Sequence, residues 1–76
     1  MRQLSREVLE NLRREYPPGC RVELVKMDDP QAPPIGTRGT VYMVDSVGTV
    51  HVHWDNGCGL GAAFGEDVVR KVGDGK

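Results

Sequence analysis

The chain has 76 residues, of which 38% are hydrophobic and 28% are charged, and its formal net charge is −1. This length allows one small hydrophobic core and leaves no room for a second domain or a deep catalytic cleft, so we expect a single domain (residues 1–76) without enzymatic activity. The near-neutral charge gives no electrostatic support for binding a nucleic acid or an anionic membrane.

The first predicted element is an amphipathic helix within residues 1–16. Leu4, Val8 and Leu12 recur at helical spacing and form one apolar stripe, and Ser5 is the expected N-cap. The proline pair that follows ends the helix, because a residue before proline is disfavoured in helical conformation. A helix this short is marginal in isolation, so its stripe must pack on the rest of the domain, on a partner or on a second copy.

Residues 19–72 carry five short strand patterns separated by turn signals. The strands are predicted within RVELVKM, TRGTVYMVD, TVHVHWD, CGLGAAF and the end of GEDVVRKV. The segment DDPQAPPIG, with three prolines, must be a loop. No crossover helix separates the strands, so a parallel sheet is excluded. The predicted fold is therefore mostly β, a small five-stranded barrel preceded by one α-helix and followed by a disordered tail at residues 73–76.

Two residues within these strands have an expected structural role. Gly39 marks a bend or a close approach between backbones, because glycine weakens a strand unless such a need exists. Trp54 alternates with Val50 and Val52 on one strand face, so we expect it in the core.

The strings YPPGCRVELVKMDDPQAPPIGTRGTV and VGTVHVHWDNG resemble the bacterial and phage-associated family called domain of unknown function 4314. The resemblance runs from about Leu12 to Val72, and its most specific parts are MDDPQAPPIG and GTVHVHWDNG. It implies a small SH3-like barrel, often encoded on mobile elements, with no assigned biochemical activity. The chain departs from the family pattern at Cys58 and at Ala62–Ala63, where small residues predict a poorly packed fourth strand.

Cysteine and histidine residues offer one candidate chemistry. Cys20, Cys58, His51 and His53 are the ligand types of a tetrahedral zinc site, but neither cysteine has a second ligand at the usual short spacing. We therefore expect two free thiols and two histidines on a solvated face, with no metal and no cofactor. A disulfide between the cysteines is disfavoured in the cytoplasm.

The acidic residues of the chain fall in predicted turns, where Asp accepts hydrogen bonds from nearby backbone N–H groups. They therefore need no calcium or catalytic role. The members of this set are Asp28, Asp29, Asp45, Asp55, Glu66 and Asp67.

The candidate binding residues are Tyr42, His51 and His53, which are predicted to form an exposed aromatic surface, with Arg38 and Arg70 beside it. Bases of a single-stranded oligonucleotide could stack on such rings while the arginines meet its phosphates.

The leading functional hypothesis is a small protein-interaction module, which would contact a partner protein through the helix stripe or the proline-stiffened loop. A single-stranded nucleic-acid-binding module is the alternative, and a zinc-binding domain ranks below both. No segment resembles a membrane span or a secretory signal, so the expected location is the cytoplasm.

Overall fold

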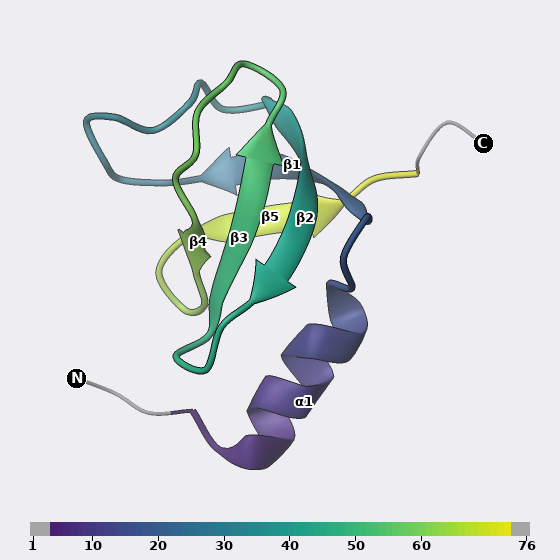
Figure 1. Cartoon of the computed structure of the whole chain (residues 1–76). Helices are drawn as coiled ribbons and strands as arrows, with labels where there is room; N and C mark the ends of the chain where they lie inside the picture. The colour runs from purple at the N-terminus through teal and green to yellow at the C-terminus, as the bar shows by residue number, and fades with distance from the viewer. Residues whose placement is uncertain (1–3, 74–76) are drawn as a thin grey trace.

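The computed structural model describes residues 4–73 and shows one helix with one five-stranded antiparallel sheet (Figure 1). The elements are α1 (Arg6–Glu15), β1 (Arg21–Lys26), β2 (Arg38–Val44), β3 (Thr49–Trp54), β4 (Ala62–Ala63) and β5 (Val68–Lys71). The strand order in the sheet is β4-β3-β2-β1-β5. The prediction of a mostly β chain with one N-terminal helix is confirmed.

Helix α1 begins where its N-cap predicts. Ser5 has extended backbone angles, and its hydroxyl accepts a hydrogen bond from the N–H of Val8 at 3.1 Å. The helix ends at Tyr16, whose N–H donates to the carbonyl of Leu12 before the chain enters the proline pair. Residues 1–3 of the predicted helical segment and residues 74–76 of the predicted disordered tail lie outside the described part of the chain.

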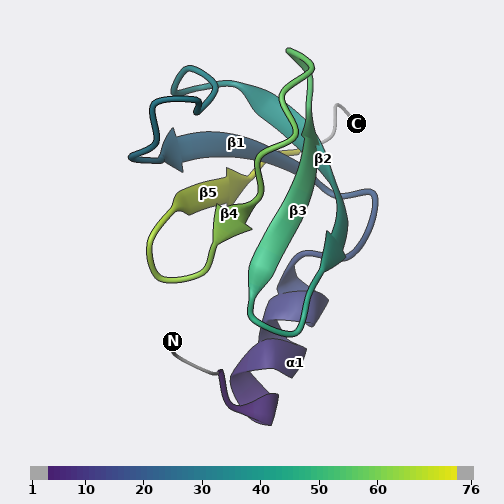
Figure 2. The same cartoon turned by 60° about the vertical axis from the view of Figure 1, so that its left-hand side comes forward.

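The sheet is strongly curved, and the core lies on its concave side. β1 pairs with both β2 and β5, and β1 and β5 cross the direction of β2 and β3 (Figures 1 and 2). Alternate residues of β1 and β3 point inward, as a period of two requires, and the β-bulge after Val41 shifts the inward positions of β2 by one residue, to Val44. The buried apolar residues are Leu12, Val22, Leu24, Val41, Val44, Val50, Val52, Trp54 and Ala62.

The predicted five-stranded barrel is wrong in one respect, because the sheet does not close. β4 and β5 are its two edges and are not paired as neighbours. The strand predicted within residues 58–64 shortens to Ala62–Ala63. The backbone groups on its outer edge already have hydrogen-bond partners. The N–H of Ala63 donates to the Asp67 carboxylate at 2.9 Å, and the carbonyl of Ala63 accepts from the N–H of Asp67. This turn occupies the groups that would have bonded to β5.

Helix α1 packs on its own sheet, at the end where β2 turns into β3 (Figure 2). Leu12 is only 6% exposed and belongs to the core, whereas Val8 is left 37% exposed. Arg13 donates from Nε to the carbonyl of Val44 at 3.2 Å. The proline-rich loop lies at the opposite end of the molecule (Figures 1 and 2). Among residues 4–73, no helix has the length and apolar character needed to cross a membrane.

Both predictions for individual strand residues are confirmed. A Cβ atom on Gly39 would lie 2.5 Å from Cγ1 of Val52 and 2.8 Å from the carbonyl oxygen of His53, so only glycine allows β2 and β3 to approach this closely. Trp54 is 3% exposed, and its indole N–H donates to the carbonyl of Leu60 at 2.7 Å. The indole therefore fills the core without leaving its polar atom unpaired.

Candidate functional site

The predicted aromatic residues lie together on the convex outer face of β2 and β3. The rings of Tyr42 and His53 are stacked, with centroids 4.1 Å apart and an angle of 20° between their planes. The ring of His51 is tilted against Tyr42 at 5.8 Å. Tyr42 and His53 are exposed, whereas His51 is half-buried. Strand alternation places the three residues on one face, and a β-bulge in β2 beside Tyr42 sets their diagonal contact.

His51 is held by Asp45 at the start of the β2–β3 turn. Its Nε2 lies 2.9 Å from Oδ2 of Asp45, whose other oxygen accepts hydrogen bonds from the N–H groups of Val47 and Thr49. Burial raises the pKa of Asp45, but the hydrogen bonds from His51 and from the two backbone N–H groups outweigh it, so this pKa lies below its usual value. The ionised carboxylate therefore orders both the turn and the imidazole.

Arg38 and Arg70 lie on the same outer face, but they gather around a carboxylate rather than around the rings. The guanidinium of Arg70 is 3.0 Å from Glu23, and Nε of Arg38 is 3.5 Å from the same oxygen. The three residues are direct neighbours across β5, β1 and β2. One carboxylate thus serves two arginines.

Arg21 is a member of this surface that sequence reasoning missed. It donates to both carboxylate oxygens of Asp55 and to the hydroxyl of Thr40, which lies opposite His53 across β2 and β3. The hydrogen bond to Asp55 raises the pKa of Arg21, and the same contact lowers the pKa of Asp55. The alternation of RVELVK carried a signal, since it places Arg21 beside Glu23 on the outer face.

The cysteine and histidine set does not form a cluster. Within residues 4–73, no group of three or more Cys, His, Asp or Glu side chains is placed to hold a metal ion. Cys20 and Cys58 are free thiols, and Sγ of Cys58 contacts the carbonyl of Gln31 in the proline-rich loop. Burial raises the pKa of the Cys20 thiol, which keeps it protonated and weakly nucleophilic.

The prediction that acidic residues cap turns is confirmed at three positions. Asp29 accepts from the N–H of Gln31, Asp45 accepts from two N–H groups, and Asp67 accepts from Ala63. Asp55 differs, because its carboxylate pairs with Arg21 instead.

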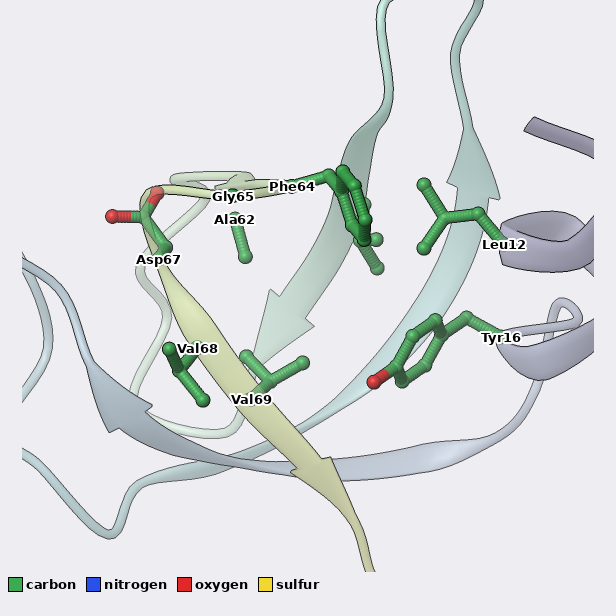
Figure 3. A pocket seen from close by; sticks show the side chains of 9 residues that line it. Leu12, Tyr16, Ala62, Phe64, Gly65, Asp67, Val68 and Val69 are labelled. Carbon is green, nitrogen blue, oxygen red and sulfur yellow. The ribbon is translucent and has the colours of Figure 1, made fainter. Parts of the chain in front are cut away.

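An apolar groove of about 290 Å³ opens on the other side of the sheet, between α1 and the two unpaired edges (Figure 3). Leu12 of α1 extends toward Tyr16 and Phe64, which directly follow α1 and β4, and Val69 faces them from β5. The groove exists because the sheet stays open, so that α1 covers only part of the gap. The full lining is Leu12, Tyr16, Val50, Ala62, Phe64, Gly65, Asp67, Val68 and Val69.

Phe64 is the centre of a wider apolar surface. Its side chain is 51% exposed, and it also borders two further hollows, one beside Val8 and one beside Val47. Val47 and Val68 are similarly exposed. We call Phe64, Val8, Val47, Val68 and Tyr16, together with the groove beneath them, the Phe64 surface.

The Phe64 surface was not predicted from the sequence, although one signal pointed to it. Phe64 is the only phenylalanine in the chain, and it stands directly before the turn residues Gly65, Glu66 and Asp67. A large aromatic residue between a glycine-rich segment and a turn has few neighbours that could bury it. By contrast, the segment DDPQAPPIG is confirmed as a loop, and Ile35 within it is 63% exposed.

A family model described as domain of unknown function (DUF4314) matches residues 5–72, which extends the resemblance from Leu12 back to Ser5. No curated protein and no solved structure shows a significant match to the chain.

Proposed function

The chain belongs to the domain of unknown function (DUF4314) family, whose description assigns no activity, and we propose from the site itself that it is a non-catalytic protein-interaction module. The observation that supports this function is the exposed Phe64 beside an apolar groove. A domain of 76 residues gains little stability from burial, since folding removes only about 60% of the surface of the unfolded chain from solvent. Leaving a large apolar side chain exposed is therefore costly. A partner protein that covers Phe64 would recover the burial that the domain itself does not achieve.

The composition of the surface fits protein association better than catalysis. Aromatic residues, phenylalanine among them, are enriched in protein interfaces, where a few side chains that become fully desolvated supply most of the binding energy. Of the polar side chains in the groove, the Asp67 carboxylate is already bonded to the N–H of Ala63. Burial raises the pKa of Tyr16, and the nearby charge of Glu15 adds to this effect, so the hydroxyl stays neutral. The groove thus offers apolar contact and no activated nucleophile.

The test is affinity capture from a host lysate with and without nuclease, comparing three matched variants. Phe64→Glu removes the centre of the proposed surface, Ile35→Glu alters the proline-rich loop, and Val25→Glu changes an exposed valine that lines none of the hollows. We expect a nuclease-resistant partner that is lost only with Phe64→Glu. Loss with Ile35→Glu alone would move the interface to the loop, and capture that is equal for all three would contradict both surfaces.

The stacked rings of Tyr42 and His53 favour a second candidate, binding of single-stranded nucleic acid. Their exposed faces are suitable for base stacking, but the nearby arginines are already paired with Glu23 and Asp55. Few phosphates would be neutralised, so the affinity should depend weakly on salt. Titration of a labelled mixed-sequence oligonucleotide tests this, and Tyr42→Ala should abolish binding. No change in fluorescence anisotropy at low salt would eliminate the candidate.

Three finer features belong to the same proposal, of which the first two derive from the family resemblance and the third from the composition of the sequence. We infer an SH3-like arrangement, a bacterial or mobile-element origin and a cytoplasmic location. The pairing of β1 with both β2 and β5 supports the first of these, because it bends one sheet over a single core as small barrels do. An experimental structure compared with SH3-like domains would test the arrangement.

A further inference from the structure

The outer edge of β5 carries backbone groups that residues 4–73 leave unbonded. The N–H of Val72 donates to the carbonyl of Arg21, and Arg70 lies opposite Glu23 in the strand register. The backbone groups of residues 70 and 72 therefore bond toward β1. The alternation of an antiparallel ladder then turns the N–H and C=O groups of Val69 and Lys71 away from β1. Among the described residues, no turn or loop hydrogen bond uses these four groups.

The two edges of the sheet therefore differ. At β4, the Asp67 carboxylate and the turn after Ala63 bond to the outward-facing backbone groups, which is a common way to block an edge. In the described part of the chain β5 has no such cover, and it borders the groove through Val68 and Val69 (Figure 3). A strand added to β5 would lie along the groove and direct every second side chain into it.

We propose that the domain binds an extended segment of a partner protein by strand addition to β5, with apolar residues entering the groove and an acidic residue facing Arg70. This inference rests on the proposed interaction function and specifies the form of the partner. Backbone hydrogen bonds to Val69 and Lys71 would supply sequence-independent affinity, and the groove would select the inward-facing side chains.

The preference for an acidic residue on the added strand follows from the charges on the outer face of the sheet. Among residues 4–73, the ion pairs of Arg21, Arg38 and Arg70 involve the two carboxylates of Glu23 and Asp55, which leaves one positive charge in excess. Arg70 is 61% exposed at its side chain and lies on the outermost strand. The residue opposite Arg70 on an added strand would thus be favoured as Asp or Glu, because opposite charges across a strand pair attract.

A second copy of the chain fits this edge poorly. The register that uses all four free groups of β5 in both copies would place each Arg70 directly opposite its counterpart, and like charges in that position are destabilising. A register centred on Val69 would need the N–H of Asp67, which already donates to Ala63 at 2.9 Å. The edge is therefore better matched to a partner segment than to itself.

The first test uses a capped heptapeptide, VEVEVEV, added to the isotope-labelled full chain. We expect the amides of Val69 and Lys71 to become protected from hydrogen exchange. Methyl groups on the valine amides, which would face β5, should weaken binding about tenfold or more, whereas methyl groups on the glutamate amides should change it less than about twofold. The lysine peptide VKVKVKV should bind more weakly, since its charges would face Arg70.

The matched protein variants are Lys71→Pro and Lys71→Ala. Both remove the side chain, but only proline removes the outward N–H, and proline is tolerated where that group faces solvent. Binding should be lost with Lys71→Pro and retained with Lys71→Ala, with both variants shown to be folded by amide shift dispersion. Equal binding by the two variants, insensitivity to amide methylation, or no peptide binding at all would overturn strand addition.

These outcomes separate the two proposals. If partner capture depends on Phe64 while the peptide does not bind β5, the interaction function stands and the strand-addition mode is wrong. If capture is indifferent to Phe64→Glu, the interaction surface itself is wrong. Concentration-dependent dimers in light scattering that disappear with Lys71→Pro would assign the edge to a second copy instead.

Discussion

Truncation of Leu12 to alanine tests whether α1 is an integral part of the domain. Leu12 is 6% exposed and lies in the core cluster, whereas Val8, one turn earlier in the same helix, is 37% exposed. Leu12→Ala should therefore destabilise the domain strongly, and Val8→Ala should change its stability by less than about 0.5 kcal/mol.

The expected size of the effect follows from what the truncation removes. Three buried carbon groups are lost, each contributing about 0.8 kcal/mol of transfer free energy, and the cavity left behind adds to this loss. Leu12 also lines the groove, so solvent can reach part of that cavity and relieve some of its cost. We expect a loss of about 2–3 kcal/mol, near the lower end of the range for buried leucines.

Urea denaturation followed by the fluorescence of Trp54 measures this difference directly. Trp54 is the only tryptophan and is 3% exposed, so its emission reports on the core. A cost for Leu12→Ala no larger than that for Val8→Ala would refute the docking of α1 on this core. Midpoints that shift with protein concentration would instead indicate that the helix packs between two copies.

Three further substitutions test other contacts. Gly39→Ala should destabilise the domain by about 1–3 kcal/mol in the same urea assay, because the new Cβ overpacks the β2–β3 contact. Gly59→Ala is its control, since no atom lies within 4 Å of a Cβ there, and an equal cost for both variants would contradict the steric argument. Asp45→Asn should lower stability at neutral pH. Because the folded pKa of Asp45 is depressed, the stability of the wild type that depends on its carboxylate is present above about pH 3.8 and is lost as the pH falls through the folded value. Denaturation curves from pH 6 to pH 2.5 should converge for the two proteins, and parallel curves would be inconsistent with this role. Trp54→Phe should cost about 1–3 kcal/mol by circular dichroism, since it leaves the carbonyl of Leu60 without its donor, and a neutral result would mean that water replaces the indole N–H.

The sequence was sufficient for features that depend on neighbouring residues. Ser5 and the proline pair set the ends of α1, and the alternation of TVHVHW placed Trp54 in the core and both histidines outside. Gly39 was identified because a glycine within a strand usually marks a bend or a close approach between backbones. The common outer face of Tyr42, His51 and His53 also followed from alternation, whereas the stacking of Tyr42 on His53 depends on the β-bulge beside Tyr42.

The candidate groove could not be predicted in this way, because it depends on how the sheet fails to close. The sequence carried five strand patterns and therefore indicated a barrel, but it could not show that Asp67 would occupy the N–H of Ala63 and block one edge. That contact leaves the outer edge of β5 without a partner strand and Phe64 exposed beside α1. Local periodicity determines which side chains share a face, whereas edge pairing depends on competition between backbone groups that meet only when the chain has folded.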